Sequence, residues 1–191
     1  MSVVFKTLRA SRVDVEVRIE RLIKLVNHDK SAFSELFEAI LHPDPGVRSV
    51  ASQASERITR DKPELLQGFK NMLVYKVTKV EQKEVKESAI PMLTRMPISP
   101  REYSTVFNIL AGYLEDKEST VALKALEGIE LMLSLSDRAD NDNTPPLRPS
   151  VLSLLEKIAC GEDPHLQESS KKLLDRINGT ATEVSASPTS A

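Results

Sequence analysis

Histidine and cysteine, the side chains that most often bind metals or act as nucleophiles, are rare in this chain of 191 residues. The three histidines, His28, His42 and His165, stand far apart. No two of them have the H-x-x-H or H-E-x-x-H spacing that places two metal ligands on one helix face. We therefore expect no metal site, no cofactor and no catalytic histidine.

Cys160 is the remaining candidate nucleophile, because Asp163 and His165 follow it closely and a Cys–His pair can form an activated thiolate. However, Cys160 ends an apolar helical stretch after Ile158 and Ala159, where a lone cysteine is more often a small buried apolar side chain. We expect the buried role and no catalytic residue. A single cysteine cannot form an intrachain disulfide, so we expect a reducing, cytoplasmic compartment.

Asp137, Asp140 and Asp142 form the one acidic cluster that resembles a calcium loop. An EF-hand loop that started at Asp140 would need glycine at position 145 and glutamate at position 151. The chain has Pro145 and Val151 there. These aspartates are therefore predicted to be solvated loop residues.

Composition favours a helical chain without a strong overall charge. Leu, Ala, Glu, Lys and Ser dominate, glycine occurs 6 times, and the formal net charge is -2. Residues 1–100 hold 17 Lys and Arg against 13 Asp and Glu (+4), and residues 101–191 hold 9 against 15 (-6). Overall charge thus gives no reason to expect nucleic acid or an anionic membrane as the partner. No apolar stretch approaches the ~20 residues that span a bilayer.

A helical repeat is the strongest pattern in the chain. In residues 47–58 the apolar or small side chains fall at positions 47, 50, 51, 54 and 58, the spacing of one helix face. This face recurs 35 residues earlier and 35, 71 and 119 residues later, most clearly in two columns of equivalent positions: Ile19, Ala54, Ala89, Ala125 and Leu173, and Ile23, Ile58, Leu93, Ile129 and Ile177. Other apolar helices are predicted between these, at 33–41, 65–73, 106–114 and 151–158. The unit is helix, turn, helix, with a period of 35 to 36 residues.

Capping residues and prolines mark matching points of the repeats. An Asp-Pro pair at 44–45 and another at 163–164 each place a capping carboxylate before a first-turn proline. Ser99, followed by Pro100 and Glu102, offers the same kind of start with a capping box. These positions predict where helices begin.

Residues 41–54, LHPDPGVRSVASQA, resemble the turn and second helix of a HEAT repeat, in which an Asp-containing turn precedes Val-Arg and spaced alanines. Weaker matches lie at 76–95, 115–132 and 163–177. The resemblance implies an all-α fold, a short right-handed α-solenoid of about four helical hairpins with an N-terminal capping helix.

The predicted organisation is one HEAT-like helical repeat domain at residues 1–178. It contains a long polar loop at 136–149, and a disordered tail follows at 179–191. The family resemblance also implies a structural pairing of Arg48 with a turn acid such as Asp44.

HEAT-like proteins usually bind other macromolecules along the concave side, where the second helices line up. The resemblance therefore implies a non-enzymatic interaction module or scaffold that binds a protein or peptide partner there. The predicted contact surface consists of exposed positions on the second helices: Ser52, Glu56, Glu87, Leu123 and Glu127, together with Lys171 and Asp175.

Two other classes with the same helical stacking stay open. HEAT-like DNA glycosylases resemble basic proteins that use aromatic side chains, whereas this chain has no Trp and a negative net charge. Residues 57–86 nevertheless hold eight lysines and arginines, so a basic stripe for nucleic acid is the alternative prediction. HEAT-like lyases that attach a bilin to a protein form the third class, although nothing in the sequence specifies a tetrapyrrole.

Overall fold

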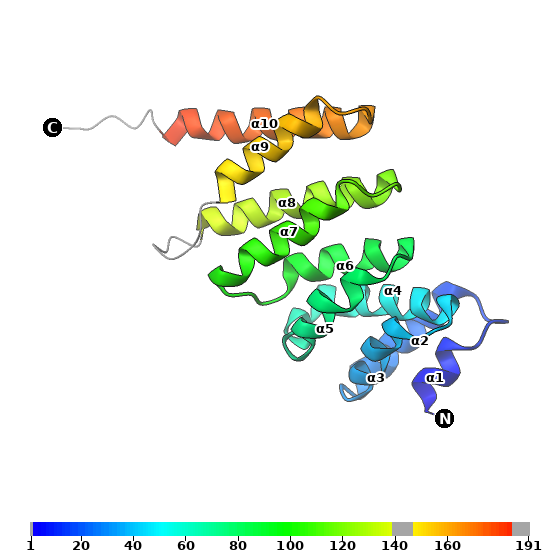
Figure 1. Ribbon diagram of the computed structural model, residues 1–191. Helices are drawn as coiled ribbons and strands as arrows, with labels where there is room; N and C mark the ends of the chain where they lie inside the picture. Colours follow the sequence, from blue (N-terminus) through cyan, green and yellow to red (C-terminus); the bar gives the residue numbers. More distant parts are fainter. Residues whose placement is uncertain (1, 139–146, 185–191) are drawn as a thin grey trace. The chain divides into compact units, whose positions relative to one another are not determined.

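The computed structural model describes residues 2–138 and 147–184, which form helices joined by turns with no β-strand among them (Figure 1). The all-α prediction is confirmed for these residues. The chain divides into two compact units, Met1–Ser99 and Pro100–Ala191. None of the described helices combines the length and the apolar character needed to cross a lipid bilayer.

In the N-terminal unit, α4 (Pro45–Asp61) packs against both α2 (Val15–His28) and α6 (Lys83–Arg95) (Figure 1). The shorter elements pack against these three helices: α1 (Val3–Leu8), α3 (Ala32–Glu38), the 3-10 turn η1 (Ala39–Leu41), η2 (Pro63–Phe69), α5 (Lys70–Tyr75) and η3 (Val77–Lys79). The long helices lie where the repeat predicts them.

Local sequence explains the start and the buried face of α4. The Asp44 carboxylate accepts hydrogen bonds from the backbone N–H groups of Gly46 at 2.8 Å and Val47 at 3.4 Å, as the capping prediction requires. Pro45 occupies the first turn, where its missing N–H has no partner to lose. The predicted face is buried: Val47, Val50, Ala51, Ala54 and Ile58.

Three phenylalanines form an aromatic cluster in the core of this unit. The Phe37 ring lies 5.6 Å from that of Phe33 and 4.8 Å from that of Phe69, and Phe33 and Phe69 meet edge to face at 5.5 Å. Phe33 and Phe37 are 1% and 0% exposed. The cluster joins α3 to the end of η2, so it links elements that are about 30 residues apart in sequence.

Arg48 connects consecutive repeats, but its predicted pairing with Asp44 is wrong. Its Nε donates to Oε1 of Gln82 at 2.9 Å, and its Nη1 donates to the carbonyls of His42 at 3.0 Å and Pro43 at 2.8 Å. The Asp44 carboxylate is instead held by the backbone N–H groups that it caps. Arg48 therefore binds the turn backbone and the residue before α6.

The C-terminal unit contains two pairs of packed helices. α7 (Tyr103–Tyr113), preceded by the 3-10 turn η4 (Pro100–Glu102), packs against α8 (Ser119–Arg138). α9 (Leu147–Ala159) packs against α10 (Pro164–Val184), and α8 contacts both of them. Buried apolar side chains from all four helices fill the interior: Val106, Leu110, Val121, Ala125, Ile129, Val151, Leu155 and Leu173.

Several helix ends differ from the prediction. The chain after Ser99 forms the turn η4, so α7 starts only at Tyr103. α8 extends into the predicted loop because Met132 and Leu133 are buried and anchor its last turns. α10 continues to Val184, beyond the predicted domain end at 178. α9 starts at Leu147, so positions 147–149 of the predicted loop are helical. Residues 139–146 of the predicted loop and 185–191 of the predicted tail lie outside the described residues.

Asp163 caps α10, as predicted. Its carboxylate accepts hydrogen bonds from the backbone N–H groups of Leu166 at 3.2 Å and His165 at 2.9 Å, and from the Ser119 hydroxyl at 3.0 Å. These bonds, led by that from Leu166, lower the pKa of Asp163 below its ordinary value of 3.8. A lowered pKa in the folded state stabilises the fold at higher pH, and this stabilisation is lost as pH falls through the folded-state pKa.

We therefore expect Asp163→Asn to make the free energy of unfolding less dependent on pH under acidic conditions. Asparagine caps a helix about as well as aspartate but does not titrate, so stability at neutral pH should change little while the loss below about pH 4 becomes smaller. Urea unfolding across a pH series measures this. Glu162→Gln, at the exposed neighbouring position, is the control; an unchanged acid slope in Asp163→Asn would contradict the assignment.

Candidate functional site

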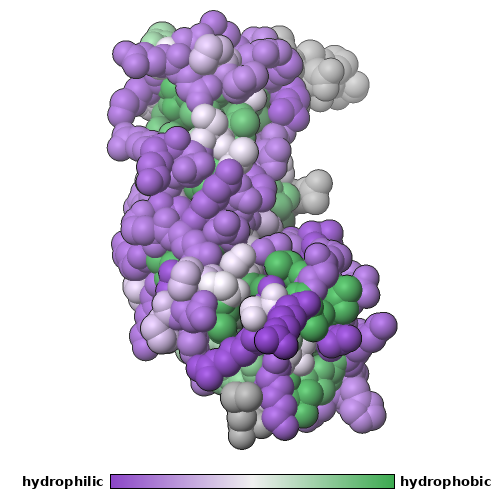
Figure 2. Space-filling view, turned by 90° about the vertical axis from the view of Figure 1, so that its right-hand side faces the viewer, coloured by the Kyte–Doolittle hydropathy of each residue, from purple (hydrophilic) through white to green (hydrophobic). Residues whose placement is uncertain are grey.

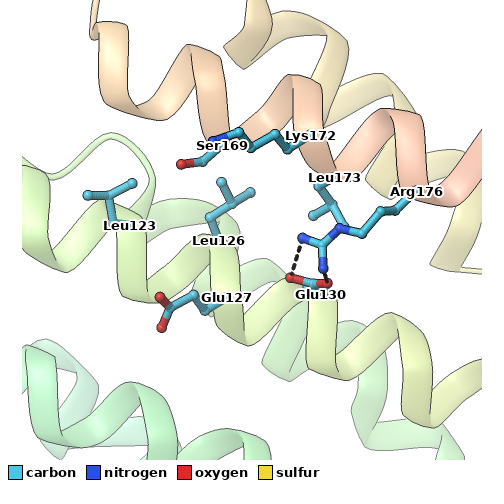
Figure 3. Close-up of a pocket in the computed structure, with 8 residues that line it drawn as sticks. All are labelled: Leu123, Leu126, Glu127, Glu130, Ser169, Lys172, Leu173 and Arg176. Carbon is cyan, nitrogen blue, oxygen red and sulfur yellow. Dashed lines mark hydrogen bonds and ion pairs between the residues drawn. The ribbon is translucent and has the colours of Figure 1, made fainter.

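A groove of about 230 Å³ runs between α8 and α10 in the part of the chain that the structure describes (Figure 3). Each helix contributes four lining side chains with the same spacing: Leu123, Leu126, Glu127 and Glu130 from α8, and Ser169, Lys172, Leu173 and Arg176 from α10. Residues three, four and seven positions apart share one face of a helix. The groove is thus built from two regular helix faces.

The groove has an apolar floor. Leu126 and Leu173 are 4% and 3% exposed, and Leu123 is half-buried beside them. The remaining lining residues are polar or charged, so an apolar floor is bordered by groups that can orient a ligand.

Glu130 and Arg176 connect α8 to α10 by an ion pair (Figure 3). The two contacts, at 2.5 Å and 3.2 Å, join both carboxylate oxygens to both terminal guanidinium nitrogens. Their side chains are 34% and 62% exposed, so the pair contributes only ~0–1 kcal/mol to stability. It does neutralise the Glu130 carboxylate.

Lys172 and Glu127 differ in the partners that they have. The Lys172 ammonium lies 2.6 Å from the Glu168 carboxylate and, by hydrogen bonding to it, lowers the pKa of Glu168. Glu127 is exposed and makes no hydrogen bond or ion pair with another described residue. Glu127 therefore leaves one carboxylate charge available at the groove.

Of the predicted contact residues, Leu123 and Glu127 come together in this groove. Lys171 and Asp175 are exposed, as predicted, but do not line it. The face of α10 that borders the groove carries Lys172 and Arg176, each of which comes one residue after a predicted position.

The prediction that Ser52 is an exposed contact residue is wrong. Ser52 is 0% exposed, and its hydroxyl donates to the Ser49 carbonyl at 3.0 Å. The physical reason is that α4 packs against α2 and α6 together, which buries a wider stripe than a helix packed on one side presents.

Glu56 is largely occupied by structural contacts. Its side chain is 12% exposed, and its carboxylate accepts from Arg95 of α6 at 2.8 Å and from Arg60 at 2.9 Å. Arg95 also donates to the Glu56 carbonyl at 3.0 Å. These contacts tie α4 to α6. Glu87 on α6, also predicted as an exposed contact residue, is only 22% exposed, and its carboxylate lies 4.0 Å from the Lys83 ammonium.

The predicted burial of Cys160 is also wrong. The thiol is exposed because Cys160 comes after the last residue of α9, in the turn before α10. No group of three or more His, Cys, Asp or Glu side chains in residues 2–138 and 147–184 is arranged to hold a metal ion. Asp140 and Asp142 of the acidic cluster lie outside the described residues.

The basic stretch at 57–86 does not form one set of available cations. The Arg57 guanidinium binds the Glu16 carboxylate, and this hydrogen bond lowers the pKa of Glu16. Four further members have partners in the same unit: Arg60 with Glu56, Lys62 with Asn27, Lys83 with Glu87 and Lys86 with Glu81. The number of lysines and arginines in this stretch is therefore larger than the number of positive charges available to bind a polyanion.

The N-terminal unit also has exposed apolar surface. The space-filling view shows it among hydrophilic side chains (Figure 2). The exposed apolar side chains of α1 and α2 are Val3, Val15 and Val17, with 61%, 40% and 39% exposure. Scattered exposed valines are normal on soluble proteins. The groove, which combines an apolar floor with charged borders, is therefore the better candidate.

Sequence reasoning did not assign to a binding surface the other six lining residues: Leu126, Glu130, Ser169, Lys172, Leu173 and Arg176. The available signal was the shared 0, +3, +4, +7 spacing in α8 and α10. Comparison with known proteins supplies no further residue: no protein-family model matches the chain, and no curated protein matches it at a significant level.

Proposed function

We propose that the chain is a HEAT-like repeat protein, a short right-handed α-solenoid of about four helical hairpins with an N-terminal capping helix. Side-chain hydrogen bonds between residues about one repeat apart support this proposal. Arg48 and Gln82 are 34 residues apart, and Ser119 and Asp163 are 44 apart. Stacked hairpins produce such contacts because each repeat packs on the next.

The proposed function is that of a non-enzymatic interaction module or scaffold, which binds a protein or peptide on the concave face formed by the second helices. The groove between α8 and α10 carries this proposal. It combines an apolar floor with the Glu127 carboxylate, which has no partner among the described residues, and this combination suits recognition by surface contact. We also propose a cytoplasmic, reducing location, which suits the exposed thiol of Cys160.

A protein partner is better supported than nucleic acid. The groove is bordered by the Glu127 carboxylate, which has no partner among the described residues and repels phosphate, and most of the basic stretch at 57–86 already binds acceptors of its own unit. The same reasoning disfavours a DNA glycosylase relative.

We expect Glu127→Lys to abolish capture of the protein partner without lowering the melting temperature. The exposed side chain contributes little to stability, whereas a lysine would repel a partner that approaches a carboxylate. Affinity capture from native lysate at low and moderate salt, read by mass spectrometry, measures the loss.

Glu156→Lys is the matched control, because Glu156 is also exposed and lies on α9, away from the groove. One protein recovered with the wild type and with Glu156→Lys, but not with Glu127→Lys, would support the proposal. Equal recovery by all three forms, or recovery mainly of nucleic acid released by salt, would contradict it.

A further inference from the structure

The apolar surface at the groove continues along α8 beyond the eight lining residues. Leu131 is 46% exposed and lies four residues after Glu127, which in turn lies four residues after Leu123. Side chains at i, i+4 and i+8 form one ridge on a helix surface. The ridge on α8 therefore alternates an apolar, an acidic and an apolar side chain over about 12 Å.

This ridge is suited to a helix rather than an extended segment. No sheet edge exists in the described residues to add a strand to, which removes the backbone pairing that holds most extended peptides. Ridges of the i±4n type pack into the matching grooves of another helix. An amphipathic helix can place apolar side chains about two turns apart, which matches the separation of Leu123 and Leu131.

The charges around the ridge determine which net charge the bound helix should carry. The carboxylate of Glu127 stands between the two leucines without a partner among the described residues, whereas that of Glu130 is neutralised by Arg176. Residues 101–191 hold 9 Lys and Arg against 15 Asp and Glu, a net charge of -6. Both the local and the wider charge favour a basic partner.

We propose that the α8 ridge, together with the groove, binds a basic amphipathic helix of another protein. One apolar side chain of that helix enters the groove above Leu126 and Leu173, a second packs on Leu131, and a lysine or arginine between them pairs with Glu127. This inference rests on the proposed function and specifies the chemical class of the partner.

A displayed library of random peptides of about 15 residues, near the length at which isolated helices become stable, tests the proposal. The library is selected on the full chain. We expect enriched sequences to be basic, with apolar residues at helical spacing. The affinity of a synthetic copy of an enriched peptide should fall about tenfold with Glu127→Lys and about fivefold with Leu131→Gln, and stay unchanged with Glu156→Lys.

Three outcomes would overturn the inference. Enriched peptides that are acidic or proline-rich, yet depend on Glu127, would refute the basic helix while leaving the interaction function intact. If Leu131→Gln left the peptide affinity unchanged, the proposed role of the α8 ridge in binding would be refuted. The inference would also be refuted if the wild-type chain enriched peptides no better than a Glu127→Lys, Leu131→Gln double variant. In that case the affinity capture from lysate still tests the proposed interaction function independently.

Discussion

Replacing Phe37 with alanine should lower the free energy of unfolding by about 3–5 kcal/mol, a large part of the net stability of a typical domain. The Phe37 side chain is 0% exposed and meets the rings of Phe33 and Phe69 at 5.6 Å and 4.8 Å. Truncation removes its buried apolar area and leaves a cavity between two close-packed rings. Urea unfolding followed by circular dichroism gives the difference.

Tyr75→Ala is the matched control, since Tyr75 is 66% exposed in the same unit and its truncation should change stability by less than about 0.5 kcal/mol. Phe37→Leu should recover part of the loss because it refills most of the cavity. A cost for Phe37→Ala no greater than for Tyr75→Ala would show that the three rings are not closely packed.

Glu56→Ala should lower the free energy of unfolding by about 1–3 kcal/mol, because it leaves the partly buried Arg95 guanidinium without its carboxylate. The Glu56 side chain is 12% exposed and that of Arg95 is 23% exposed, so solvent screens their interaction less than that of a surface pair. The effect should persist in moderate salt. Denaturant unfolding of both single variants and the double variant with Arg95→Met measures the coupling.

Glu64→Ala supplies the comparison, because Glu64 is exposed on η2 and makes no ion pair with another described residue. If Glu56→Ala instead left stability unchanged and weakened partner capture, Glu56 would be the binding residue that the sequence predicts rather than a tie between α4 and α6.

The repeat could be predicted because the information that specifies it is local. The buried face with Ala54 and Ile58 follows from side-chain spacing within one helix, and the caps at Asp44 and Asp163 follow from hydrogen bonds within one turn. None of these features requires knowledge of a distant residue.

The candidate site could be predicted only in part because it depends on which helices pack together. Exposure of Glu127 follows from the pattern of α8 alone, but burial of Ser52 requires that α4 be covered by two neighbours. The Glu56–Arg95 tie and the groove join residues 39 and 46 positions apart, and no local pattern identifies such partners. Helical spacing predicts which face a residue lies on, while the facing helix determines what it contacts.

The sequence separation of the residues that bond between repeats determines the entropic cost of bringing them together during folding. Arg48 and Gln82 are 34 positions apart in sequence, while Glu130 and Arg176, which lie on either side of the longer connection between α8 and α9, are 46 positions apart. Because the entropy of closing a loop grows only with the logarithm of its length, the longer connection adds just about 0.3 kcal/mol. Lengthening the chain between these two helices is therefore almost free of entropic penalty, and natural or engineered insertions there should leave the pairing of α8 with α10 intact.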